Sequence, residues 1–261
     1  MKVCKIHRAL YGLRISPKRW YERLTIVLQS IGLKPNDKEP CLFLWRENEK
    51  LLILLIYVDD MIIASNKDEK LNDVIAKLEK EFEITNLGEP REFLGITIKH
   101  DKINNIMKLN QEKYINKILK RFKFDESCPK RTPMITSQVA NRERKLREEN
   151  YDKQTLVETE TKENVPYREV VGSLLYLSNA TRPDISFAVN VLSRHQINPK
   201  ENDWKMVKRV MRYLQGTVHF SLTFKGLEDD IQAYSDASHG DCKRSLTTCG
   251  HLIKIFGNSI L

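Results

Sequence analysis

The sequence has 261 residues, 41% of them hydrophobic and 30% charged, which is enough apolar material for one large domain or two smaller ones. The five cysteines are scattered without a CxxC pair, which argues against a disulfide framework or a zinc site, and the longest apolar run, residues 51–64, contains two aspartates, which argues against a membrane span. The net charge of +9 favours a polyanionic partner, either nucleic acid or an anionic membrane surface, over a protein that simply has many lysines.

The first hundred residues alternate between helices and strands. A helix is predicted from Ser16-Pro17 to about Ser30, because proline suits a first helical turn and Gly32 then ends the helix. Apolar spacing predicts a second helix over residues 67–82. Runs of β-branched and large apolar residues predict strands at residues 41–45, 51–58, 61–64 and 93–98.

The second half begins with an amphipathic helix over residues 110–123, whose basic side chains lie largely opposite its apolar face. Residues 127–165 combine prolines and mixed charge with few large apolar groups, which predicts a mobile or disordered linker, with room for a solvated helix. Beyond it, the pattern predicts helices at residues 167–179, 184–195 and 200–215, then strands near 220–224, 231–235 and 248–256.

The tetrad Tyr57-Val58-Asp59-Asp60 lies between two apolar runs and is the strongest indication of chemistry. We expect both flanking strands to be largely buried, where two unpaired carboxylates would be unfavourable by several kcal/mol. Divalent ions would remove that cost, and in two-metal phosphoryl transfer the ions lie about 4 Å apart. The alternative is an ordinary hairpin, although Asn-Gly or Asp-Gly would be the usual turn.

Several motifs, in colinear order over nearly the whole chain, resemble the reverse transcriptase of copia-type LTR retrotransposon Pol polyproteins. The tetrad resembles the active-site hairpin of that family. The other matching segments are residues 9–21, similar to the stretch before that hairpin; 92–96, similar to the primer-grip strand; 167–177 and 181–185, similar to the connection region; and 233–238 with 247–251, similar to the opening hairpin of an RNase H domain.

The resemblance implies an RNA-directed DNA polymerase that performs two-metal nucleotidyl transfer with Mg²⁺ or Mn²⁺. Asp59 and Asp60 would be its catalytic metal ligands, and Asp236, at the end of a strand, the first metal ligand of the RNase H portion. The remaining implied roles are nucleotide binding by Tyr57, Val58, Gly12, Ser16 and Pro17; primer grip by Phe93, Leu94 and Gly95; and nucleic-acid binding by Lys113, Lys117, Lys120 and Arg121. For the lysines, the alternative is a solvated helix face.

The implied fold is α+β. Its expected parts are a partial palm (1–100), a thumb-like basic helix (101–126), the linker (127–165), a helical connection (166–226) and a truncated RNase H-like start (227–261). The implied partners are an RNA template, an RNA–DNA hybrid, deoxynucleoside triphosphates and the rest of the Pol polyprotein, without a membrane. Because no signal peptide or membrane span is predicted, we expect a cytoplasmic or nuclear location.

Two features of the family have no counterpart in the sequence. The RNase H-like piece stops at Leu261, and the remaining Asp/Glu residues of that domain are absent. The polymerase needs a third carboxylate on a strand that precedes the loop at Gly12, and that motif would lie before Met1. We therefore expect a fragment truncated at both ends, with little or no polymerase activity as the isolated chain. The alternative is a non-catalytic nucleic-acid-binding remnant of a transposon.

Overall fold

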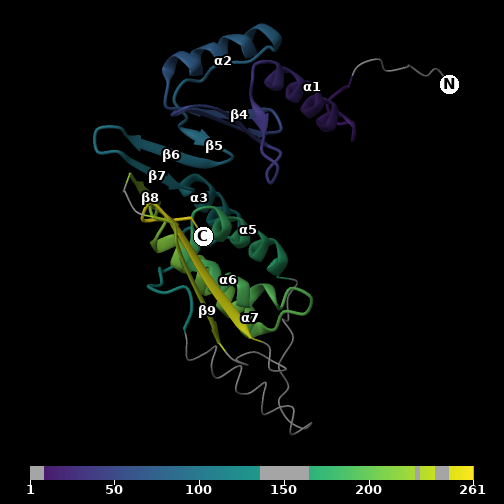
Figure 1. The fold of residues 1–261 in the computed structure, drawn as a ribbon. Helices are drawn as coiled ribbons and strands as arrows, with labels where there is room; N and C mark the ends of the chain where they lie inside the picture. The colour runs from purple at the N-terminus through teal and green to yellow at the C-terminus, as the bar shows by residue number, and fades with distance from the viewer. Residues whose placement is uncertain (1–8, 136–164, 227–229, 239–246, 261) are drawn as a thin grey trace, which may run out of the picture. The chain divides into compact units, whose positions relative to one another are not determined.

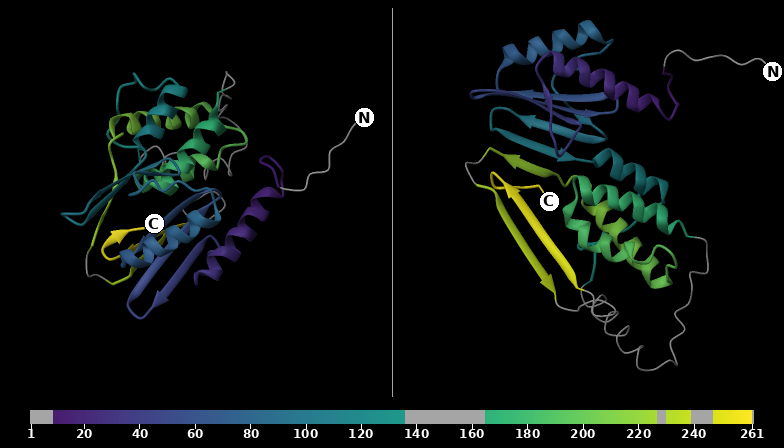
Figure 2. Two further views of the ribbon diagram at one scale, coloured as in Figure 1. Left: turned by 90° about the horizontal axis from the view of Figure 1, so that it is seen from above. Right: turned by 45° about the vertical axis from the view of Figure 1, so that its right-hand side comes forward.

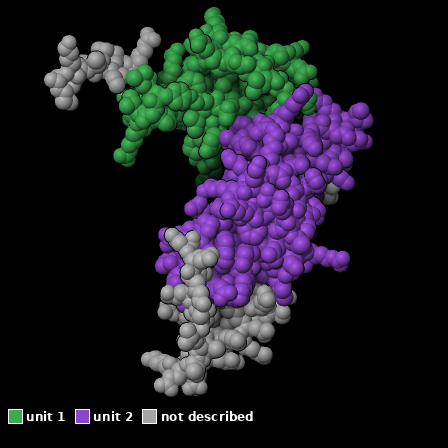
Figure 3. Space-filling view, turned by 180° about the vertical axis from the view of Figure 1, so that it is seen from behind, with its two compact units in different colours: residues 1–90 green, residues 91–261 purple. Residues whose placement is uncertain are grey.

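The computed structural model describes residues 9–135, 165–226, 230–238 and 247–260. The chain divides into two compact units, residues 1–90 and 91–261 (Figure 3). Helices and antiparallel sheets build the fold, so the predicted α+β class is confirmed. In the part of the chain that the structure describes, no helix is both long and apolar enough to cross a membrane.

The first unit contains a four-stranded antiparallel sheet in the order β1-β2-β3-β4. Its elements are α1 (Ser16–Ser30), β1 (Lys34–Pro35), β2 (Leu42–Glu47), β3 (Lys50–Tyr57), β4 (Asp60–Ser65) and α2 (Asp68–Glu81). Figure 1 labels strand β4 and the two helices α1 and α2 of this unit. Proline lies in the first turn of α1 and Gly32, with φ +93°, follows its end, as predicted. Strand β1 was not predicted, because two residues are too short to form a pattern.

Buried and more exposed side chains alternate along β3, and the buried ones form part of the core of this unit. Leu52, Leu54 and Ile56 are buried on one face, and helices α1 and α2 cover that face. The prediction that both strands beside the aspartates are largely buried is wrong for β4, whose residues are only half-buried or exposed. The physical reason is that β4 is the edge strand of the sheet, with β3 on one side only.

The second unit has a four-stranded antiparallel sheet in the order β5-β6-β7-β8 and a group of helices. The sheet consists of β5 (Glu92–Phe93), β6 (Ile96–Asp101), β7 (Ile106–Asn110) and β8 (Leu222–Lys225). The helices are α3 (Glu112–Arg121), α5 (Tyr167–Ala180), a 3-10 turn (Pro183–Ile185), α6 (Ser186–Ser193) and α7 (Glu201–Gly216). A separate sheet, in the order β11-β10-β9, contains β9 (Gln232–Ser238), β10 (Thr248–Ile255) and β11 (Asn258–Ser259).

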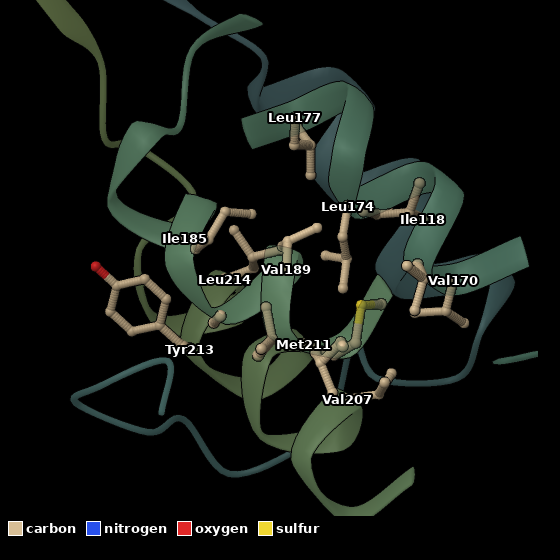
Figure 4. Close-up of a cluster of buried hydrophobic side chains, with 14 of the residues drawn as sticks. Ile118, Val170, Leu174, Leu177, Ile185, Val189, Val207, Met211, Tyr213 and Leu214 are labelled. Carbon is tan, nitrogen blue, oxygen red and sulfur yellow. The ribbon is translucent and has the colours of Figure 1, made fainter. Parts of the chain in front are cut away.

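The core of the second unit lies between its helices. Figure 4 shows apolar side chains from α3, α5, α6 and α7 pointing toward one another, among them Ile118, Leu174, Val189 and Met211. Each of these four side chains is at most 3% exposed. For α3 and α7, the two of these helices whose apolar face the sequence indicated, the 3.6-residue spacing located the buried face correctly.

Several elements of the second unit differ from those predicted. The strand expected over 93–98 is split into β5 and β6 by a two-residue turn, Leu94-Gly95, with φ +50° and +75°. Strand β7, which was not predicted, pairs with β6 and with β8 from more than a hundred residues later. The helix expected over 184–195 is a 3-10 turn followed by α6.

The beginning of the predicted linker is packed against α7. The Lys130 amide donates to the Arg212 carbonyl over 3.2 Å, and Arg209 donates to the Thr132 carbonyl over 3.1 Å. A Cβ on Gly216 would lie 2.9 Å from Pro129, which shows how closely this stretch approaches the helix end. Residues 136–164 of the predicted linker lie outside the described residues.

Candidate active site

The predicted catalytic tetrad forms the tip of the β3–β4 hairpin. Tyr57 pairs with Asp60, so the loop consists of Val58 and Asp59, and the Asp-Asp turn inferred from the sequence is displaced by one residue. Val58 has φ +54°. A β-branched residue in this left-handed region is strained, at a cost of about 1–3 kcal/mol.

The neighbouring β2–β3 hairpin has the same loop length and provides an internal comparison. Glu47 pairs with Lys50 around the loop Asn48-Glu49, and Asn48 has φ +54°. Asparagine tolerates this conformation well, whereas valine does not. A turn of this length therefore does not require valine, and of these two hairpins only β3–β4 holds a β-branched residue in the left-handed region.

The two candidate catalytic carboxylates are exposed at this tip. The expected cost of burying them therefore does not arise in the described structure, because the edge strand β4 presents them at the surface. The Tyr11 hydroxyl donates a hydrogen bond to the Asp59 carboxylate. That hydrogen bond is the main reason why the pKa of Tyr11 is raised, since it stabilises the protonated hydroxyl.

Helix α1 holds the other side of the tip. The Trp20 indole N–H donates to the Val58 carbonyl over 2.7 Å, and the Tyr21 hydroxyl donates to the Pro40 carbonyl over 2.9 Å. The Trp20 ring meets Phe82 edge-on, with 5.1 Å between ring centres. The sequence did not predict this contact of Trp20, because a hydrogen bond between residues 38 positions apart has no local pattern.

The three residues predicted to line a nucleotide pocket lie in the same unit as the hairpin. Gly12, with φ +87°, is exposed in the loop before α1, and Pro17 lies in the first turn of that helix. The Ser16 hydroxyl donates to the Leu10 carbonyl and closes the loop. The contact between Tyr11 and Asp59 brings this loop to the tip of the β3–β4 hairpin.

The carboxylates of Asp59 and Asp60 suit a hard divalent cation. Mg²⁺ prefers oxygen ligands and is usually bound through one or two carboxylates together with waters and substrate phosphates. Over the described ranges, no group of three or more His, Cys, Asp or Glu side chains could hold a metal ion. The hairpin therefore offers two protein ligands, and a complete site needs further oxygen ligands.

The predicted primer-grip residues form the β5–β6 turn of the second unit. The Tyr176 hydroxyl of α5 donates to the Leu94 carbonyl over 2.6 Å. Tyr176 in turn meets Tyr114 of α3 edge-on, with 5.1 Å between ring centres. The turn is thus supported by two tyrosines that the sequence did not associate with it.

The four predicted nucleic-acid-binding cations of α3 are not equivalent. Lys113 forms an ion pair with Glu92, and Arg121 forms one with Glu169. Lys117 and Lys120 are exposed and form no ion pair with any residue that the structure describes. These two lysines are therefore the more available partners for phosphate.

Asp236 lies within β9, opposite Gly250, and not at the end of a strand as predicted. Strand pairing extends to Ser238, which places the carboxylate on an exposed sheet. His251 lies in β10 and pairs with Ser235 of β9, within the strand predicted for residues 248–256.

Comparison with known proteins identifies the family of this chain. The reverse transcriptase (RNA-dependent DNA polymerase) family matches residues 1–136, more than half of the chain, and this range includes the tetrad at residues 57–60. The chain belongs to the reverse transcriptase family. No solved structure matches it at a significant level.

The relatives of this reverse transcriptase chain are transposon proteins. It is 33% identical to a retrovirus-related Pol polyprotein from transposon TNT 1-94 of Nicotiana tabacum, over 99% of this chain and 19% of that protein. It is 34% identical to the Pol polyprotein from transposon RE1 of Arabidopsis thaliana, over 96% of this chain and 16% of that protein. A putative transposon Ty5-1 protein of Saccharomyces cerevisiae is 29% identical, over 91% and 73%. The chain spans less than a fifth of the plant polyproteins.

Proposed function

We propose that this chain is a segment of an RNA-directed DNA polymerase and that Asp59 and Asp60 bind the divalent ions of nucleotidyl transfer. The observation that carries the proposal is the hairpin tip, where two adjacent carboxylates follow a strained valine in a chain of the reverse transcriptase family. Strained backbone persists where the surrounding structure holds it, and such residues cluster at functional sites.

In this proposal the chain supplies binding and orientation. Asp59 and Asp60 hold Mg²⁺ or Mn²⁺, which supplies charge stabilisation and an activated primer hydroxyl. Tyr57 and Val58 flank the primer end and the nucleotide, and Gly12, Ser16 and Pro17 border the nucleotide from the loop before α1. The remaining metal ligands come from substrate phosphates, water and carboxylates beyond those described here.

The finer assignment of parts belongs to the same proposal. Residues 1–100 form a partial palm, 101–126 a thumb-like element, 166–226 a connection and 227–261 an RNase H-like start in which Asp236 binds metal. Their proposed partners are an RNA template, an RNA–DNA hybrid, deoxynucleoside triphosphates and the rest of the polyprotein, in the cytoplasm or nucleus. The proposed palm ends at residue 100, whereas the two compact units divide between Pro90 and Arg91. Strands β5 and β6 therefore belong to the second compact unit.

Replacing both aspartates, Asp59→Asn with Asp60→Asn, is expected to weaken Mn²⁺ binding at least about tenfold, because amides carry no negative charge. Titration of Mn²⁺ into the purified chain, followed by electron paramagnetic resonance of the free ion, measures this affinity. The matched control is Glu47→Gln with Glu49→Gln, which removes two acidic groups from the neighbouring hairpin of the same loop length. Equal loss of binding in the two double variants would contradict the proposal.

The same preparations test synthesis. With only two protein carboxylates at the hairpin, we expect templated primer extension by the isolated chain to be orders of magnitude below that of a complete polymerase. Robust extension that Asp59→Ala abolishes would show that these residues suffice. Nucleic-acid binding without Asp59-dependent Mn²⁺ binding would favour the alternative of a non-catalytic nucleic-acid-binding remnant.

Replacing Lys117 and Lys120 by glutamine is expected to weaken binding to an RNA–DNA duplex and to reduce the salt dependence of that binding. If each lysine meets one phosphate, the slope of log K against log salt falls by about 0.9 per lysine. Filter binding at several salt concentrations measures both quantities. The control is Lys77→Gln with Lys80→Gln, two exposed lysines at the same spacing on α2. An unchanged slope in the α3 variant would exclude these lysines as phosphate contacts.

A further inference from the structure

The hairpin tip is held from two sides by side chains that come from outside the hairpin. Tyr11 contacts the Asp59 carboxylate, and Trp20 donates its indole N–H to the Val58 carbonyl over 2.7 Å. The Val58 carbonyl belongs to the peptide unit that joins Val58 to Asp59, and that unit is planar. A hydrogen bond that fixes the carbonyl therefore also fixes the orientation of this peptide plane, which includes the backbone nitrogen and Cα of Asp59.

Trp20 itself has little freedom to move. It lies on α1, whose next residue, Tyr21, donates to the Pro40 carbonyl over 2.9 Å. Its ring meets Phe82, which follows the end of α2, in an edge-on contact with 5.1 Å between ring centres. The indole donor is thus anchored between both helices of the first unit.

The hydrogen bond from Trp20 acts on a residue with a strained backbone conformation. The β2–β3 hairpin reaches φ +54° with Asn48, which suits that conformation, whereas the β3–β4 hairpin reaches φ +54° with Val58, which does not. A strained residue keeps its conformation only where the surrounding contacts determine it. The hydrogen bond from Trp20 is such a contact, and it acts directly on the strained residue.

We propose that Trp20 is a positioning residue that holds the Val58 carbonyl and thereby orients Asp59 and Asp60 for metal binding. The effect on metal binding rests on the proposed function. The effect on the conformation of the hairpin tip does not depend on that function and can be measured separately. Trp20 touches neither carboxylate in this scheme and acts only through the backbone of the loop. Its loss therefore changes local order at the tip as well as metal affinity.

The test uses the whole chain and the variant Trp20→Phe, which keeps an aromatic ring against Phe82 and removes the N–H donor. The loss of one hydrogen bond is expected to accelerate amide hydrogen exchange in peptides covering residues 55–62 by about fivefold and to weaken Mn²⁺ binding by a similar factor. The matched control is Trp45→Phe on β2, whose ring lies under the Lys70 ammonium at 4.7 Å from its centre. That control leaves exchange at residues 55–62 and Mn²⁺ affinity unchanged.

Repeating the test in a Val58→Asn variant distinguishes the proposed hold on the hairpin tip from a general loss of stability. Val58→Asn relieves the strain, so Trp20→Phe is expected to accelerate exchange much less in this background than in the wild type. Equal acceleration in both backgrounds overturns the link to strain. Unchanged exchange at residues 55–62 in Trp20→Phe, with Mn²⁺ binding that still depends on Asp59, overturns the inference and leaves the proposed function intact. Accelerated exchange in a chain that binds no Mn²⁺ supports the hold and contradicts the proposed metal site.

Discussion

Replacing Arg182 by alanine is expected to lower the free energy of unfolding of the second unit by about 2–5 kcal/mol, the range for truncating a large buried side chain. Its partner Asp184 has a side chain that is 32% exposed, so water can replace part of the lost contact to that carboxylate. The Arg182 side chain is 1% exposed. Its Nε and Nη2 donate to the two oxygens of Asp184 over 2.9 and 2.7 Å. Nη1 donates to the Thr217 carbonyl over 3.0 Å, so the guanidinium joins the turn before α6 to the end of α7.

The alanine variant loses more than one contact. It leaves the Asp184 carboxylate with the Tyr213 hydroxyl, at 2.7 Å, as its remaining side-chain partner among the described residues. It also removes a large buried side chain that stacks within 5.6 Å of the Tyr213 ring centre and 5.3 Å of that of Phe220. Arg182→Lys keeps the charge but cannot donate in the bidentate arrangement, so we expect it to recover only part of the loss.

The free energy of unfolding of the second unit can be measured separately by monitoring hydrogen exchange in peptides of α5 and α7 as the urea concentration is raised. Arg194→Ala is the control, because Arg194 is exposed and its substitution is expected to cost less than about 0.5 kcal/mol. The double variant Arg182→Met with Asp184→Asn should recover part of the stability relative to Arg182→Ala, since methionine refills much of the buried volume that alanine leaves empty. Equal stability of Arg182→Ala and Arg194→Ala would contradict the role assigned to Arg182.

The same cluster makes the second unit sensitive to acid. Burial by itself raises the pKa of Asp184, but the hydrogen bonds from Arg182 and Tyr213 and the charge of Arg182 outweigh burial and lower that pKa overall. A carboxyl group with a lower pKa in the folded state stabilises the fold above its unfolded pKa of about 4, and this contribution is lost as the pH falls through the folded value. Asp184→Asn should remove this part of the acid dependence in unfolding curves recorded from pH 6 to pH 2.

Replacing Leu54 by alanine is expected to destabilise the first unit by about 2–5 kcal/mol, because it leaves a cavity beneath the sheet. Leu54 is fully buried at the centre of β3, on the face covered by α1 and α2. The same strand continues to Tyr57 and the candidate metal ligands. The cavity should therefore also weaken Mn²⁺ binding, by loosening the scaffold on which the hairpin rests.

The control for Leu54→Ala uses the same residue type in the same strand. Leu51 is 37% exposed near the start of β3, so Leu51→Ala should destabilise the unit much less. Hydrogen exchange in peptides of α1 and β3 as a function of urea measures both variants. Similar losses for Leu51→Ala and Leu54→Ala would show that the alternation along β3 does not determine the core.

The spacing of apolar residues in the sequence was sufficient to predict the longer helices. Helices α1, α2, α3, α5 and α7 begin and end within about three residues of their predicted bounds, because an amphipathic face has to repeat every 3.6 residues wherever it packs. The apolar runs around Asp59 and Asp60 likewise predicted two strands and a turn. The motifs in colinear order identified the reverse transcriptase family, which the match over residues 1–136 confirms.

The sequence by itself therefore determined the α+β class, most elements, the family and the candidate catalytic pair. Only the tertiary structure revealed the strain at Val58, the donors Trp20 and Tyr176, the burial of Arg182 and the exposure of the edge strand β4. The physical reason is the range of the interactions. Helix faces and strand alternation depend on residues a few positions apart, whereas Trp20 reaches Val58 across 38 positions and Tyr176 reaches Leu94 across 82. Contacts of that range are set by packing, for which a local pattern carries no signal.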